Sequence, residues 1–183
     1  MNWLHLSWIL AAAYLAVFLE ACIGFPRSWL GVQIDLLPAL MVYTALTNNV
    51  AVISVVAVFG GLCFDALSAN PLGVSVLPLF LIGFVIDRAR ELLVRESLYA
   101  QFLLGAAASA AQPLGTLFLM VNVRAAPPLG WGLLWKWLVL TVSGAVATPL
   151  LFALFDRLHK AFDYQPAPES SFRPDREIKR GRS

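Results

Sequence analysis

The sequence predicts an all-α membrane protein, a polytopic bundle of about six transmembrane helices. Two observations lead to this fold class. Of the 183 residues, 60% are hydrophobic and 13% are charged, and the mean hydropathy is +0.76, whereas soluble domains are about half apolar and about a quarter charged. The apolar residues also form six segments, most of them close to the roughly 20 residues that a spanning helix needs. We therefore expect a bilayer, rather than water, to surround most of the chain.

Such a bundle would use residues 1–157 and leave a tail at 158–183. The tail is rich in Pro, Ser and charged residues from Gln165 onward, a composition that buries too little apolar surface to fold alone. The sequence therefore predicts one membrane domain followed by a disordered cytoplasmic tail, with no second globular domain.

The first half of the chain supplies four of the predicted spans. Ala12 and Ala16 in the first, and Gly60 and Gly61 in the third, are small residues of the kind that allow membrane helices to approach closely. The fourth is short for a full crossing. The four spans lie at about Leu4–Ile23, Ile34–Leu46, Val50–Leu67 and Pro71–Ile86.

The second half begins with the charged stretch Asp87–Ser97, which we interpret as a short surface helix. The fifth span, at about Leu98–Val121, is dominated by Gly, Ala and Ser between residues 105 and 111, a composition typical of a packing face. The sixth, at about Leu133–Phe155, has Gly144 and Thr148 four residues apart, and prolines in both spans predict bends.

The basic residues predict the orientation of the bundle. Ten of the thirteen lysines and arginines follow the fourth or the sixth span, on the side that both termini share if the spans number six. The other three are Arg27, Arg124 and Lys136. The excess of basic residues in cytoplasmic segments therefore predicts that both termini are cytoplasmic.

The most unusual stretch is Gly60–Gly83, which is apolar but contains an acid and a turn signal. Asp65 ends one predicted helix, and Asn70, Pro71 and Gly73 would form the turn to the next, with Pro71 opening that helix. An acid at membrane depth is costly and calls for a reason. One interpretation is a helix-end carboxylate that accepts hydrogen bonds from the amides of the 68–73 turn; the other is a partner-binding role.

Two further acids, Glu20 and Asp35, are predicted at the same outer depth as Asp65. Glu20 could reach the lipid headgroups or face the bundle interior. Asp35 could cap the second helix or bind a partner. Together the three predict a polar patch near the outer surface.

The sequence offers little catalytic chemistry. It contains two histidines, His5 and His159, and lacks the metalloprotease, serine-hydrolase and phosphate-loop motifs. Cys22 and Cys63 lie in apolar segments and are interpreted as small buried hydrophobic residues. We therefore predict no enzyme, no cofactor, no metal site and no nucleic-acid partner, and treat an intramembrane enzyme using Asp65 as a remote alternative.

Three stretches resemble the rod shape-determining protein MreD family. Asp65-Ala-Leu-Ser-Ala-Asn-Pro-Leu-Gly73 is similar to that family's Asp-x-x-Ser-x-x-Pro-Leu-Gly pattern. The stretch Asp35–Leu46 resembles its second helix, although Pro38 departs from the usual acid-after-proline order, and Pro149-Leu-Leu-Phe152 fits its closing helix. The resemblance covers about Ile34–Lys160, and Asp65, Pro71 and Gly73 are carried over only as motif positions.

The resemblance implies a multi-pass protein of the bacterial inner membrane. Its members belong to the cell-elongation machinery and associate with MreC, and through MreC with MreB and with the glycosyltransferase and transpeptidase of side-wall peptidoglycan synthesis. The fold would be similar to the substrate-binding subunits of energy-coupling-factor vitamin transporters. The leading hypothesis is a non-enzymatic scaffold that helps to maintain cell shape, and the alternative is such a vitamin-binding subunit.

Overall fold

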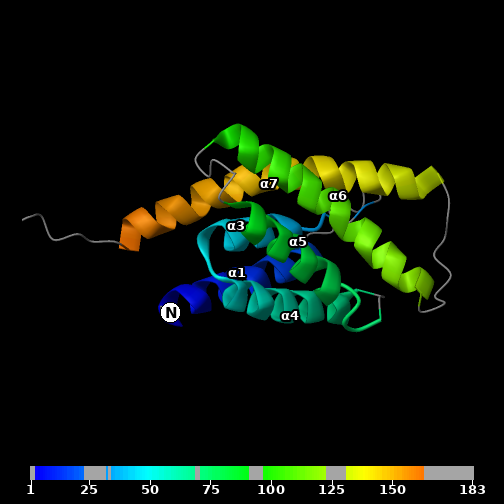
Figure 1. Cartoon of the computed structure of the whole chain (residues 1–183), viewed down its shortest axis with the longest axis horizontal. Coiled ribbons are helices and arrows are strands. Elements are labelled where there is room, and N and C mark those ends of the chain that lie inside the picture. Colours follow the sequence, from blue (N-terminus) through cyan, green and yellow to red (C-terminus); the bar gives the residue numbers. More distant parts are fainter. Residues whose placement is uncertain are drawn as a thin grey trace, which may run out of the picture.

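The computed structural model describes residues 3–22, 32, 34–68, 71–90, 97–122 and 131–162, and every regular element in them is an α-helix. Successive helices alternate in direction, so the start of α1 and the end of α7 lie at the same end of the bundle (Figure 1). The predicted all-helical class is confirmed. The helices are α1 (Trp3–Cys22), α3 (Leu37–Thr47), α4 (Val50–Leu67), α5 (Val76–Ala89), α6 (Leu98–Asn122) and α7 (Trp131–Phe162).

Three of these helices are long and apolar enough to cross a membrane: α4, α6 and the 131–158 part of α7. Two other helices contain shorter apolar stretches among the described residues, Ser7–Glu20 in α1 and Leu37–Thr47 in α3. Short helices at membrane depth are tolerated where the protein itself surrounds them. The structure therefore supports a membrane helical bundle in which the other described helices surround the short helix α3.

The centre of the bundle is α3, which packs against all five other described helices. Ten of its eleven residues are buried, which explains why its sequence is apolar on every side rather than along one stripe. Tyr43 stacks on Phe155 at 4.3 Å between ring centroids and meets Phe152 edge-on at 5.0 Å. These contacts tie α3 to the second half of α7.

Small residues bring α6 and α7 into close contact; the sequence predicted a packing face in this part of the chain but not that these two helices would meet. A side chain on Gly105 would overlap Thr148, and one on Gly144 would overlap Ser109. In α1, by contrast, the fully buried line is Ile9, Ala13 and Val17, while Ala12 and Ala16 are half-buried.

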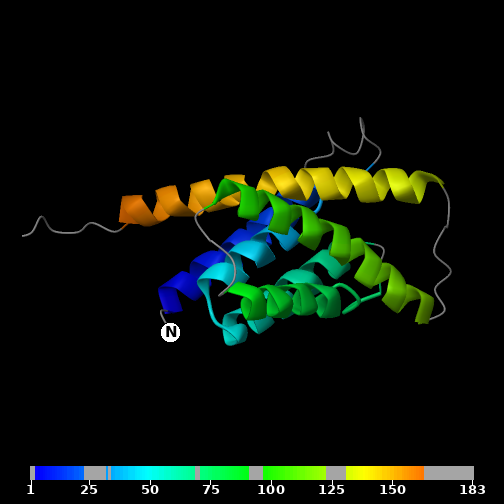
Figure 2. The ribbon, with the colours of Figure 1, turned by 45° about the horizontal axis from the view of Figure 1, so that its top comes forward.

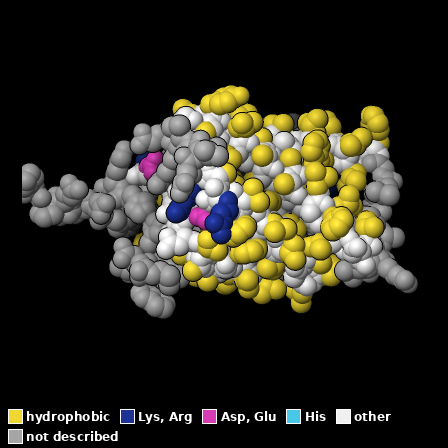
Figure 3. All heavy atoms as spheres, in the orientation of Figure 1, with side chains coloured by type: hydrophobic (Ala, Val, Ile, Leu, Met, Phe, Trp, Pro, Cys, Tyr) yellow, Lys and Arg dark blue, Asp and Glu magenta, His cyan; other side chains and the backbone are white. Residues whose placement is uncertain are grey.

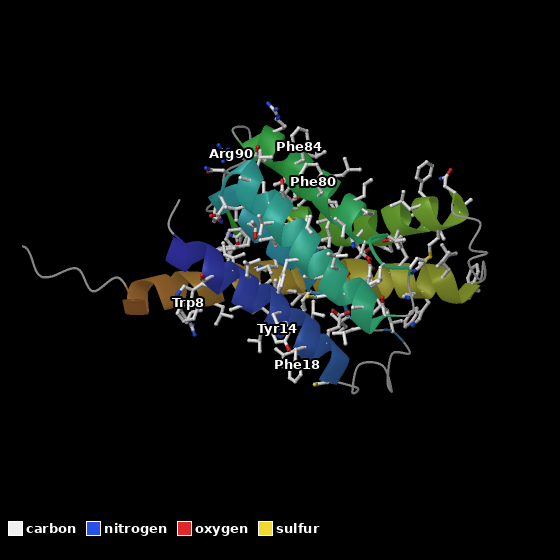
Figure 4. All side chains as sticks on the ribbon, turned by 90° about the horizontal axis from the view of Figure 1, so that it is seen from below. Trp8, Tyr14, Phe18, Phe80, Phe84 and Arg90 are labelled. Carbon is white, nitrogen blue, oxygen red and sulfur yellow. The ribbon has the colours of Figure 1, made fainter. Side chains whose placement is uncertain are left out.

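The outer surface is mainly apolar, as a bilayer requires. Large hydrophobic side chains are exposed on every helix but α3, and they cover most of the face in Figure 3, where charged groups gather at one end. Trp8, Tyr14 and Phe18 project from α1, and the rings of Tyr14 and Phe18 stack at 6.3 Å (Figure 4). At the end of α5, Arg90 forms an ion pair with Asp87 at 3.4 Å.

Four sequence expectations need correction. Pro71 does not open the fourth helix, because residues 71–75 form a turn and α5 begins at Val76. Residues 87–89 of the expected surface helix continue α5, and 91–96 lie outside the described residues. Cys22 is exposed and Cys63 only half-buried. The closing helix continues past Arg157 to Phe162, and the tail from 163 lies outside the described residues.

Candidate functional site

The candidate site is built around Asp65, which lies in the last turn of α4 with only 1% of its surface exposed. Its Oδ2 atom accepts hydrogen bonds from the backbone N–H groups of Gly73 at 2.8 Å and Ser75 at 3.1 Å. Ser75 is the residue that precedes α5. The carboxylate therefore holds the turn and the start of α5, where a negative charge is also favoured by the helix dipole.

The turn itself explains the glycine of the motif. The N–H of Val74 bonds to the carbonyl oxygen of Pro71 at 3.3 Å, and Gly73 has a φ of +91°. A positive φ at the third position of a four-residue turn is the type II geometry, which favours glycine. Pro71 is exposed. Asn70, the remaining motif residue, lies outside the described residues.

A glycine on α4 allows this arrangement to form. Gly61 lies one turn before Asp65 on the same face, and a Cβ atom there would be 2.8 Å from Val76 Cγ2 and 2.9 Å from Val76 Cα. Only a residue without a side chain permits α4 and α5 to approach this closely. The close approach brings the first turn of α5 within reach of the Asp65 carboxylate.

Asp35 lies beside this turn, immediately before α3. Its Oδ1 atom accepts a hydrogen bond from the N–H of Leu37 at 2.9 Å, and the residue is 8% exposed. Asp35 is therefore not the capping residue itself, because Leu36 holds that position without a side-chain cap hydrogen bond, but its carboxylate accepts the first N–H of α3. Asp35 is also within electrostatic range of Asp65 and of Lys136 on α7, so the structure brings two of the three predicted acids together.

Glu20 lies near the C-terminal end of α1, which runs alongside α4 in the same direction (Figure 4). The residue is half-buried, and both carboxylate oxygens are shielded from solvent. This favours the interpretation in which Glu20 faces the protein interior. The structure places it at the same end of the bundle as Asp65, without a described contact between the two.

Sequence reasoning missed the part that Ser75 plays. The sequence predicts a turn that ends at Gly73 and a next helix that begins at Pro71, and this prediction does not include the second amide donor. The signal was present, since serine is a common residue immediately before a helix. Two atoms at this place, Asp65 Oδ1 and Ser75 Oγ, are buried and have no hydrogen-bond partner among the described residues.

Sequence reasoning also missed a line of buried polar residues on α6. Gln101, Ser109 and Gln112 are each less than 10% exposed and face the bundle interior. They lie in a segment dominated by alanine, where their spacing of eight and three residues marks one helix face. That spacing was a usable signal.

Comparison with protein families decides the identity of this bundle. The family described as rod shape-determining protein MreD matches residues 3–160. The chain belongs to the MreD family. The match extends the resemblance, which began at Ile34, through α1 to nearly the start of the chain. Comparisons with curated proteins and with solved structures gave no match.

Membership gives the chain a role in determining rod shape. MreD proteins are shape-determining membrane proteins and not a known family of enzymes. The geometry of the site agrees with this assignment, because the described hydrogen bonds of both Asp65 and Asp35 go to backbone N–H groups. Within the described ranges, no group of three His, Cys, Asp or Glu residues is placed to hold a metal ion.

Proposed function

We propose that this MreD protein is a non-enzymatic scaffold of the cell-elongation machinery in the bacterial inner membrane. In this proposal it binds MreC, and through MreC it is linked to MreB and to the glycosyltransferase and transpeptidase that build the side wall. The observation that carries the proposal is the family match over residues 3–160. The apolar outer surface supports it, because a scaffold in the bilayer needs exposed faces on which a partner helix can pack.

The small-residue faces contribute less to this proposal than the sequence suggested. Gly105, Ser109, Gly144 and Thr148 pack against one another within the chain and are not available to a partner. We therefore assign the partner contact to the motif turn and the outer helix faces. In this proposal the turn at Asp65 and Gly73 lies on the outer side of the membrane, where it holds the ends of α4 and α5 in the shape that MreC recognises.

Co-purification tests the proposal directly. The tagged chain, expressed together with MreC and extracted in mild detergent, should recover MreC in a fixed ratio. We expect Asp65→Asn and Gly73→Leu to reduce the recovery of MreC several-fold, because both weaken the turn. Gly132→Leu is the matched control, since a side chain at Gly132 would meet nothing within 4 Å.

Failure to recover MreC when both proteins are folded would refute the scaffold proposal. Full recovery with both motif variants would instead limit the motif to a local structural role. A vitamin that remains bound through purification would favour the transporter-subunit alternative.

A further inference from the structure

The inference begins with a row of side chains on the outer face of α1. Four exposed residues of this helix follow one another by four, three and four positions, the spacing that keeps residues on one face of a helix. The buried line of α1 described above faces the bundle on another side of the helix. Figure 4 shows Tyr14 and Phe18 projecting from α1 on the side away from α4. The row, called the α1 seam below, consists of Ser7, Ala11, Tyr14 and Phe18.

Tyr14 places a hydroxyl group on the α1 seam near the middle of the helix. The residue is 58% exposed and lies between Trp3 and Cys22, about 16 Å from the first and about 12 Å from the second along the helix axis. Its hydroxyl has no hydrogen-bond partner among the described residues. Tyrosines on membrane helices are enriched at the interfaces with water, and a hydroxyl in hydrocarbon without a hydrogen bond is costly. The position of Tyr14 therefore calls for a partner group at the same depth.

Other hydroxyl groups on the outer parts of the helices do not have this problem. Each donates a hydrogen bond to a backbone carbonyl oxygen one turn earlier in its own helix, at 2.8 to 3.0 Å. The hydroxyl of a tyrosine cannot do the same, because the rigid ring holds it away from its own backbone. These self-satisfied residues are Ser54, Thr116 and Thr141.

A second copy of this chain supplies the missing group by symmetry. Two copies in one membrane have the same orientation, and a twofold axis along the membrane normal brings the same residue of each copy to the same depth. A phenol hydroxyl both donates and accepts hydrogen bonds, so two Tyr14 hydroxyls can bond to each other. A different partner helix would need a polar residue of its own at this depth.

The rest of the α1 seam suits contact with its own copy. Residues 7–19 carry no charge, so two copies of the face do not repel each other. The spacing of four and three is that of a parallel pair of helices, and Ala11, one turn before Tyr14, is small enough for the helix axes to approach. The 20 residues of α1 span about 30 Å, which matches the thickness of the hydrocarbon core. The two helices can therefore pack along the whole bilayer.

We propose that this protein forms a parallel homodimer through the α1 seam, in which the two Tyr14 hydroxyls hydrogen-bond to each other across the twofold axis. Ala11 forms the closest contact between the two helices. Phe18 holds the Tyr14 ring in place by the stacking contact within each copy, at 6.3 Å between ring centroids. The dimer does not depend on MreC, so its failure and the failure of the scaffold proposal are separate outcomes.

Cysteine cross-linking in membranes tests the contact. The full-length chain with Cys22→Ala and Cys63→Ala receives one new cysteine, Ala11→Cys, and is oxidised with copper phenanthroline. We expect a disulfide-linked species of twice the 20.0 kDa chain mass, because the twofold axis brings the two residues together. Val142→Cys is the matched control, since Val142 is 55% exposed on the outer face of α7, and it should give at least fivefold less dimer.

A conservative variant tests the hydroxyl itself. Tyr14→Phe removes one oxygen atom and keeps the ring, so we expect dimerisation in liposomes, measured by energy transfer between labelled copies, to weaken at least threefold. Tyr99→Phe, at an exposed tyrosine of α6, is the matched control and should leave dimerisation unchanged. Circular dichroism shows that the helices are retained in both variants.

Three results would overturn the proposal. The first is equal cross-linking of Ala11→Cys and Val142→Cys, which would indicate random collision. The second is dimerisation that is as strong in Tyr14→Phe as in Tyr99→Phe. The third is cross-linking of Ala11→Cys to a different protein in place of a second copy.

Discussion

Asp65 illustrates how backbone hydrogen bonds can stabilise a buried acid in a membrane protein. One of its oxygens accepts hydrogen bonds from the backbone N–H groups of Gly73 and Ser75. These N–H groups belong to a turn and to the start of a helix, where they would otherwise lack partners. Hydrogen bonds to an ionised group are stronger than those between neutral groups. The motif Asp-x-x-Ser-x-x-Pro-Leu-Gly is therefore a structural unit, in which the acid at its start bonds to the glycine at its end.

Removing the hydrogen-bond acceptor at Asp65 should lower the free energy of unfolding more than removing only its charge. Asp65→Ala leaves two N–H groups without their acceptor, so we expect the free energy of unfolding to fall by at least about 2 kcal/mol. Asp65→Asn keeps an acceptor oxygen and should lose about 1 kcal/mol, the difference between a charged and a neutral acceptor. Unfolding in mixed detergent micelles followed by circular dichroism measures both changes.

The exposed acid Asp156 on α7 provides the control for that series. Asp156→Ala should change the unfolding free energy by no more than about 0.5 kcal/mol. If Asp65→Ala changed the free energy of unfolding as little as this control does, the hydrogen bonds to the turn would not stabilise the protein.

At this residue scale the sequence predicted part of the site and missed part. Asp65, Gly73 and the role of Asp35 at a helix start follow from local rules of turns and caps. The second donor, Ser75, depends on where α5 begins, and a proline at residue 71 is an equally good helix opener in sequence terms. The electrostatic link between Asp35 and Asp65 depends on how α3 and α4 pack, which no local pattern specifies.

At the scale of helices, α6 and α7 behave as a pair with two different halves. Their inner halves meet through Gly105, Ser109, Gly144 and Thr148 with no room for larger side chains. Their outer halves separate and expose aromatic and aliphatic residues. The composition of residues 105–111 predicted a packing face, but it could not predict that the two helices diverge beyond it (Figures 1 and 2).

Filling the close contact should separate the pair along its whole length. Gly144→Ala places a methyl group into the Ser109 side chain, and overpacking of this kind typically costs about 1–3 kcal/mol. We expect a lower unfolding midpoint in detergent. The double variant Gly144→Ala/Ser109→Gly should recover most of the loss because it clears the space, and a purely additive pair of effects would show that the two residues are not in contact.

At the scale of the whole molecule, the described residues form one short buried helix surrounded by five others. An 11-residue helix such as α3 spans about 16 Å and could not cross a bilayer exposed to lipid. Because every other described helix packs against α3, it is not exposed to lipid and does not need to span the bilayer. The sequence predicted the number of segments, because apolar runs are long-range averages. It did not predict which segment is central, because all six have similar composition.

The alternating directions of the helices indicate how many of them cross the membrane. Length and apolar character alone qualify three helices as spans, and three crossings would put the termini on opposite sides of the membrane. The six described helices alternate in direction and put the start of α1 and the end of α7 at the same end (Figure 1), with exposed Arg88 and Arg90 at the end of α5. By the positive-inside tendency we predict that this end is cytoplasmic.

A green fluorescent protein fused to either terminus should therefore fluoresce, and alkaline phosphatase fused after Asn122 should be active, because these reporters work on opposite sides of the inner membrane. An active phosphatase at the C-terminus together with a fluorescent N-terminal fusion would mean an odd number of crossings and would contradict the six-helix topology.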